Sequence, residues 1–170
     1  MDKSIVTALM MTVAVICALV LFKAVYPAIV RGGDAMISAE ARVSKRLKTQ
    51  VEIIHAAGEL DGDGNWQDVN GDDDFDAFFW VKNVGSITIS AVDSCDLFFG
   101  QEGNFARIPY ESEAGGSYPY WTWEMENGSR WEPTRTLKIS VHHLVTLSSG
   151  RYFVKIVTPE GVADEAFFSM

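Results

Sequence analysis

The stretch IVTALMMTVAVICALVLF, from Ile5 to Phe22, decides the architecture of this chain. It holds no charged residue, and its only hydroxyl groups are those of Thr7 and Thr12. As a helix rising about 1.5 Å per residue it spans roughly 27 Å, close to the ~30 Å of a bilayer core. Three interpretations are open: a cleaved signal, a membrane anchor, or the central helix of a polymer. A signal peptide has a shorter apolar region, of about 7–15 residues, followed by a small-residue cleavage site. The pattern therefore favours the other two.

The helical pattern continues well beyond Phe22. One apolar stripe has an average spacing of 3.6 residues and so lies on one helix face: Met36, Ala39, Val43, Leu47, Val51 and Ile54. Gly58 is the expected stop, so we predict a helix over residues 1–58. A stripe that continues past an anchor has to be covered. The head domain of the same chain, a coiled-coil partner, or the same helix from neighbouring subunits would each cover it, and the pattern does not choose among them.

Charge is distributed unevenly along the chain. The net charge of −9 is the sum of +4 over residues 1–50 and −13 over residues 51–170. The acidic part argues against a nucleic-acid partner, because phosphates attract basic surfaces. The two cysteines, Cys17 and Cys95, are too few for a disulfide-stapled secreted domain, and we do not expect them to pair.

Residues 59–74 are predicted to form an acidic hinge between the helix and the head. Asp61, Asp63 and Asn65 match the first three ligand positions of an EF-hand calcium loop. The match then fails, because Trp66 stands where that loop has Gly and Asp72 stands where it has a bidentate Glu. A calcium site at Asp61, Asp63, Asn65 and Asp72 and a solvated acidic linker remain open, and no other cofactor is expected.

From Phe75 onward the apolar period changes from 3.6 to 2. Short alternating runs such as FDAFFWVKNVG, SITIS and GRYFVKIVT are separated by Gly, Asn, Pro and Ser clusters, with no helical pattern between them. About eight such runs predict an antiparallel, immunoglobulin-like β-sandwich over residues 75–170. The fold class is therefore α+β. TPEG, residues 158–161, is expected to be a tight turn joining the last two strands.

The predicted head is rich in aromatic residues but poor in catalytic motifs. Its aromatic cluster suits core or interface packing better than a carbohydrate-binding face: Tyr118, Tyr120, Trp121, Trp123 and Trp131. His142 and His143 are adjacent on a predicted strand, so they point to opposite faces and cannot share a metal. We predict no enzymatic activity. Asn127-Gly128-Ser129 is a glycosylation acceptor pattern.

A long helix with an apolar front end, joined to a β-sandwich, resembles the plan of type IV pilin-like subunits. FFWVKNVGSITIS, residues 78–90, resembles the first head strands of archaellins, the filament proteins of the archaellum. LSSGRYFVKIVTPEGVADEAFFS, residues 147–169, resembles the end of the same sandwich. The resemblance covers nearly the whole chain, and the two head stretches are its more specific part.

This resemblance implies a secreted structural subunit that forms a rotating helical filament for swimming. The subunit would wait in the membrane and then join an extracellular homopolymer, with the motor and assembly machinery as partners. The resemblance implies that the filament core is formed by Ile5, Leu9, Thr12, Val13, Ile16, Leu19, Val20, Met36, Val43, Leu47, Val51 and Ile54. Two alternatives stay open. One is a minor, accessory subunit that contacts the surface layer, and the other is a membrane-anchored module that binds carbohydrate or calcium.

Overall fold

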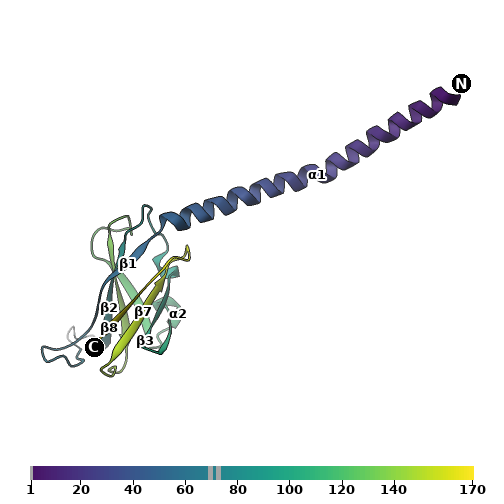
Figure 1. Ribbon diagram of the computed structural model, residues 1–170. Helices are drawn as coiled ribbons and strands as arrows, with labels where there is room; N and C mark the ends of the chain where they lie inside the picture. The colour runs from purple at the N-terminus through teal and green to yellow at the C-terminus, as the bar shows by residue number, and fades with distance from the viewer. Residues whose placement is uncertain (1, 69–70, 72–73) are drawn as a thin grey trace. The chain divides into compact units, whose positions relative to one another are not determined.

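The computed structural model describes residues 2–68, 71 and 74–170, and it divides the chain into two units, Met1–Val43 and Ser44–Met170. The first unit is helical and the second holds two β-sheets (Figure 1). In chain order the elements are α1 (Asp2–Lys48), β1 (Val51–Gly58), β2 (Phe75–Asn83), the 3₁₀ turn η1 (Val92–Ser94), β3 (Asp96–Gln101), β4 (Asn104–Ile108), α2 (Glu111–Ala114), β5 (Tyr120–Met125), β6 (Thr136–His143), β7 (Arg151–Val157) and β8 (Ala163–Ser169).

The long helix ends at Lys48, before the expected stop at Gly58. Thr49 closes its last turn: the Thr49 backbone N–H donates to the carbonyls of Lys45 (3.0 Å) and Arg46 (3.2 Å), and the Thr49 hydroxyl also donates to the Lys45 carbonyl (3.0 Å). Three basic side chains in that turn, Lys45, Arg46 and Lys48, lie where they complement the negative end of the helix dipole.

Residues 51–58 form strand β1, so the prediction that they continue the helix is wrong. β1 pairs antiparallel with β2, with Val51 opposite Asn83 and Gly58 opposite Ala77. Val51 and Ile54 fit the helical stripe by spacing alone. The segment VEIIHAAG is also β-branched at its start, and pairing with β2 decides the outcome because tertiary context overrides weak helical preference.

The second unit is a β-sandwich of two four-stranded antiparallel sheets, which confirms the predicted fold class. The strand orders are β1-β2-β6-β5 and β4-β3-β7-β8. Three cross-strand pairs between β2 and β6 are fully buried: Ala77 with Val141, Phe79 with Ile139, and Val81 with Leu137. Their neighbours in sequence face outward, as the period of 2 predicts.

The core lies between the two sheets and is closed by large aromatic side chains. The Phe79 ring of the first sheet lies 5.3 Å from the Phe99 ring of the second, centroid to centroid. Trp121 and Trp131 are each 1% exposed, so the predicted packing role of these two indoles is confirmed. Cys95 is buried and unpaired, and burial raises the pKa of its thiol to about 12.

The acidic segment 59–74 connects β1 to β2, so it lies within the head and is not a hinge between helix and head. Its first residue is tied to the sheet, because the Glu59 N–H donates to the Asp76 carbonyl at 2.7 Å, and within the segment Leu60 forms an isolated bridge with Trp66. The hinge is predicted in the wrong place because residues 51–58 are predicted to be helical, whereas they form β1.

Two local predictions have opposite outcomes. TPEG forms the expected turn between β7 and β8, with the Gly161 N–H donating to the Thr158 carbonyl at 2.8 Å and Gly161 at φ +76°. SITIS does not form a strand. Within it, Ile89 makes an isolated bridge to Trp131 and the chain then turns into η1, so this segment crosses the end of the sandwich instead of extending a sheet.

Candidate functional site

The apolar surface of α1 is the first candidate site. Within the described residues, it belongs to the one helix that is long and apolar enough to cross a membrane. Its large apolar side chains are exposed, with Ile5 at 67% and Leu19 at 59%. A contiguous apolar surface of this size marks a contact with lipid or protein.

The hydroxyl groups of α1 are satisfied within the helix. The Thr7 hydroxyl donates to the Lys3 carbonyl at 2.8 Å, and the Thr12 hydroxyl donates to the Ala8 carbonyl at 2.9 Å. A polar group in hydrocarbon is costly unless it is hydrogen-bonded. These back-bonds let both threonines lie in a lipid or protein interior.

The residues predicted to form a filament core fall into two groups. Those from Ile5 to Leu47 all lie on α1 and are exposed: Ile5, Leu9, Thr12, Val13, Ile16, Leu19, Val20, Met36, Val43 and Leu47. Val51 and Ile54 lie on β1 instead. Val51 is 7% exposed in the sandwich core, and Ile54 is 50% exposed on the sheet, so neither belongs to a helical contact surface.

The acidic loop uses its first carboxylate internally. Asp61 Oδ1 accepts hydrogen bonds from the backbone N–H groups of Asp63 (2.9 Å) and Asn65 (2.8 Å), and the Asn65 bond is the main cause that lowers the Asp61 pKa. Among the residues that the structure describes, no three His, Cys, Asp or Glu side chains are grouped to hold a metal ion. Asp72 lies outside the described residues, so the calcium site stays a prediction.

The glycosylation pattern lies on the connection between β5 and β6. Asn127, Gly128 and Ser129 are all exposed. Gly128 has φ +88°, a conformation that favours glycine and turns the chain there. The Asn127 side chain is therefore accessible to modification.

A polar cluster on the outer face of the first sheet was not predicted. His142 Nδ1 lies 2.8 Å from Asp76 Oδ1 and 3.7 Å from Asp74 Oδ2, and His142 Nε2 lies 2.9 Å from the Thr122 hydroxyl. Both carboxylates are buried, Asp74 at 6% and Asp76 at 2% exposed. The Tyr118 hydroxyl donates to Asp74 Oδ1 at 2.6 Å, and this bond raises the Tyr118 pKa. The cluster ties β2, β5 and β6 together.

His143 points away from this cluster, as the alternation of a strand predicts. Its ring lies 5.7 Å from the ring of Phe99, which belongs to the core. Burial lowers the pKa of His143 from 6.5 to about 4, so the ring is neutral at physiological pH. The prediction that the two histidines cannot share a metal agrees with these positions.

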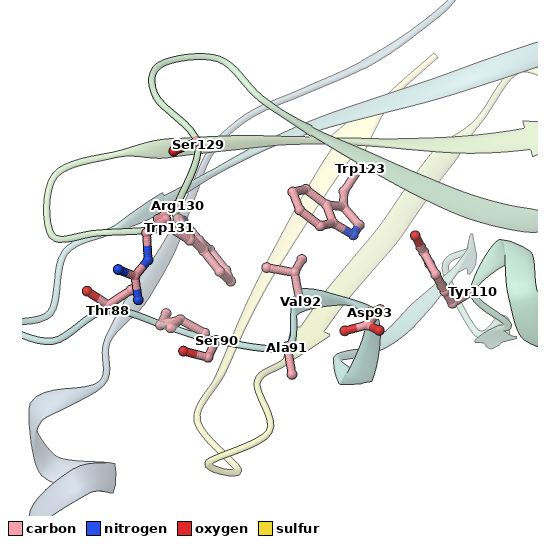
Figure 2. Close-up of a pocket in the computed structure, with 11 residues that line it drawn as sticks. Thr88, Ser90, Ala91, Val92, Asp93, Tyr110, Trp123, Ser129, Arg130 and Trp131 are labelled. Carbon is pink, nitrogen blue, oxygen red and sulfur yellow. The ribbon is translucent and has the colours of Figure 1, made fainter.

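A pocket of about 370 Å³ opens beside η1 (Figure 2). One wall is the segment Thr88–Asp93, and the opposite wall comes from Trp123 and from the segment Ser129–Trp131. Tyr110 closes one end. The pocket thus combines two indole rings and a phenol with a carboxylate, a guanidinium and three aliphatic hydroxyl side chains on separate segments.

The outer face of the second sheet carries exposed aromatic rings. Phe105 is 49% and Phe167 is 47% exposed, and each packs on Phe153, at centroid distances of 4.5 Å and 5.1 Å. The Arg151 guanidinium lies 4.7 Å from the Phe167 ring centroid and 3.5 Å from Glu102. This is an apolar patch with charged edges.

Comparisons with solved structures show a similarity to proteins of the archaellum stator. No protein-family model matches the chain, and no curated protein matches it. Chains of solved structures do match it, among them two structures of archaellum proteins. The archaellum periplasmic stator protein FlaG from Sulfolobus acidocaldarius is 29% identical, with a TM-score of 0.54 over 71% of this chain and 99% of that one. The periplasmic stator complex FlaF and FlaG from the same organism is 29% identical, with a TM-score of 0.55 over 71% of this chain and 89% of that one.

The sequence found some of these features and missed others. It located the apolar helix and the acceptor pattern at Asn127, because each is contiguous. It missed the His142 cluster and the pocket beside η1, because their members come from distant segments. The density of Trp and Tyr after residue 110 was the only signal of the pocket, and it did not separate the core indole of Trp121 from the pocket indole of Trp123.

These matches support the predicted link to the archaellum, but not the prediction that the chain is an archaellin. The solved structures that this chain resembles are archaellum proteins, but they are stator proteins and not the filament protein. They are closer to the accessory alternative than to the filament subunit. This chain is an archaellum-associated protein with an N-terminal apolar helix and a β-sandwich head.

Proposed function

We propose that this chain is a membrane-anchored subunit of the archaellum stator, the part that stays fixed while the filament rotates. The observation that carries the proposal is the likeness to FlaG at 29% identity, which includes 99% of the FlaG chain. A match that spans the other protein almost completely supports a shared role for the whole head, beyond a shared strand arrangement.

The division of α1 suits an anchored subunit. Residues 5–22 carry no charge, whereas Arg31, Asp34 and Glu40 are charged, as are four residues in the last two turns. The apolar portion is as long as a bilayer core is thick. The charged portion is costly to place in hydrocarbon and belongs in water or against protein. The apolar portion of α1 would thus lie in the membrane and the charged portion outside it.

The proposed location and partners follow from this role. The head would lie outside the membrane, and it would contact a protein of the FlaF type, because the second solved structure is a complex of FlaF with FlaG. The role is structural: we propose no enzymatic activity and no cofactor. The exposed rings of Phe105 and Phe167 are a surface on which a protein partner would bury apolar area.

Shearing the filaments from cells distinguishes a stator subunit from a filament subunit. Filaments sheared from swimming cells and the remaining envelopes would be quantified for this chain by mass spectrometry. A stator subunit stays with the envelopes and is absent from the filaments. A deletion strain would still assemble filaments but would not swim. Recovery of this chain as a main component of the sheared filaments would overturn the proposal.

The filament subunit is the second candidate, and one observation favours it. The apolar surface of α1 extends to Met36, Val43 and Leu47, beyond the length that a bilayer covers. Neighbouring helices in a polymer would cover these residues. In that case a map of the filaments would show residues 5–47 at the centre, and the deletion strain would have no filament.

A further inference from the structure

We propose that the pocket beside η1 binds a single pyranose ring, such as the terminal sugar of a surface glycan. The proposal is independent of the stator role. It rests on three observations: the volume and walls of the pocket, the unpartnered indole N–H of Trp123 beside it, and polar side chains placed around the same space.

The pocket has the size and composition of a small-ligand site. Its volume of about 370 Å³ lies at the low end of the range of roughly 300–1,000 Å³ for ligand pockets. Its walls are held in place by the sandwich: the Ile89 N–H donates to the Trp131 carbonyl at 3.0 Å, and Asn83 Nδ2 donates to the same carbonyl at 2.9 Å. The site is therefore formed before a ligand arrives.

Two indole nitrogens of the pocket have no partner. Trp123 Nε1 and Trp131 Nε1 are buried, and neither makes a hydrogen bond within the described part of the chain. Trp131 as a whole is 1% exposed. A buried N–H without an acceptor is costly and calls for a water or a ligand. Figure 2 shows the Trp123 nitrogen on the side of its ring that faces Asp93 and the Tyr110 phenol.

The other groups around the pocket suit a sugar. A pyranose ring has apolar C–H faces, which stack on aromatic rings, and hydroxyls that both donate and accept. Trp123 and Tyr110 supply the rings, the Asp93 carboxylate supplies acceptors, and the Trp123 indole N–H and the Arg130 guanidinium supply donors. An elongated aliphatic ligand would leave these polar groups unused.

The backbone at the pocket is also unusual. Ala91 has φ +55°, in the left-handed region that residues with a Cβ seldom adopt. It is held there by η1, where the Ser94 N–H donates to the Ala91 carbonyl at 2.9 Å. Such conformations cluster at ligand sites. The effect here is to turn the chain between Ser90 and Asp93, so that both side chains border the pocket.

The indole N–H signals provide a direct test. The full chain would be placed in lipid nanodiscs, since sugar-headed detergents would compete. Its five tryptophan side-chain signals would be followed by ¹⁵N NMR during titration with the methyl pyranosides of glucose, galactose and mannose. We expect the signals of Trp123 and Trp131 to shift with at least one pyranoside. The Trp80 signal should not shift, because Trp80 Nε1 already donates to Glu126 at 2.7 Å.

Asp93→Asn separates binding from folding. Asp93 is exposed, so the substitution should leave the fold intact, and it should weaken the pyranoside by roughly tenfold because a hydrogen bond to a charged acceptor is lost. Asp63→Asn, an equally exposed change on the acidic loop, should have no effect. The proposal fails if no pyranoside shifts either indole, if acyclic sorbitol shifts them equally, or if Asp93→Asn binds as the wild type does.

Discussion

The apolar residues of α1 and those of the sandwich have the same chemistry and opposite environments. In the sandwich, Phe79 and Leu137 are 0% exposed, because two sheets of the same chain enclose them. On α1, Ile5 and Leu19 are more than half exposed. The sandwich alternates apolar and polar residues and completes its own core, whereas the first part of α1 is apolar on all sides. The helix therefore depends on an environment outside this chain, and the head does not.

The largest expected effect is a break in the self-sufficient core. Phe79 is fully buried and packs on Phe99 and Phe168, so Phe79→Ala should lower the free energy of unfolding by about 3–5 kcal/mol. Urea unfolding of the full chain in nanodiscs, followed by tryptophan fluorescence, measures this loss. Val145→Ala, at a side chain that is 67% exposed, is the control and should change it by about 0.5 kcal/mol or less. Equal effects of the two changes would contradict the described core.

The second prediction tests whether the apolar part of α1 lies in a membrane. Ala14→Arg places a charge in the middle of the uncharged stretch, at a cost of about 2.5–3.5 kcal/mol for a residue at the bilayer centre. We expect less of the chain in carbonate-washed membranes and no change in the unfolding of the head. Ala41→Arg is the matched control, because Ala41 lies in the charged portion of α1. Full membrane retention of Ala14→Arg would remove the anchor interpretation.

The third effect concerns His143, whose ring lies beside Phe99 in the core. Its folded-state pKa of about 4 lies below the ordinary 6.5, so the unfolded chain binds a proton more readily. The stability due to a neutral His143 is therefore complete above about pH 6.5 and is lost as the pH falls toward about 4. The loss should be roughly 2–3 kcal/mol, lessened by partial solvent access.

A substitution isolates His143 from other groups that titrate in this range. Burial is the main cause that lowers the His143 pKa, and Asp76, which raises it, and His142, which lowers it further, act more weakly from the opposite face of the sheet. His143→Gln should flatten the dependence of the urea midpoint on pH between about pH 7 and about pH 4 relative to the wild type. Parallel profiles would show that His143 is solvated.

The sequence predicted most of the fold because most of its signals are local. A run of uncharged residues and strict alternation each identify an element without knowledge of its neighbours. The prediction for residues 51–58 was wrong because the spacing of their apolar residues fits a helix while their β-branched start fits a strand. What decides between these is the pairing of Val51 with Asn83 and of Gly58 with Ala77. That information lies in residues 77–83 and not in the segment itself.

The candidate sites were less predictable for a related reason. The pocket beside η1 needs Asp93, Tyr110, Trp123 and Arg130, which meet only after the two sheets have closed. The His142 cluster needs the β2–β6 register that sets Asp76 opposite His142. Spacing along the chain carries no sign of either. Alternation did predict that His142 and His143 diverge, because that depends on one strand alone.

The smallest effect compares the outer faces of the two sheets. Lys138 on β6 pairs with Glu124 at 2.9 Å, and its ammonium group also lies 4.6 Å from the Phe78 ring centroid. Lys155 on β7 pairs with Glu165 at 3.2 Å, and within the described residues it has no such ring contact. Exposed ion pairs contribute about 0.2–1 kcal/mol, and a cation–π contact adds about 0.5–1 kcal/mol. Lys138→Met should therefore cost more in urea unfolding than Lys155→Met, by about 0.5 kcal/mol or slightly more. High salt should weaken both ion pairs while leaving much of this difference, because the ring contact is partly desolvated. An identical loss for the two variants would mean that the contact with the Phe78 ring adds nothing to the contribution of Lys138.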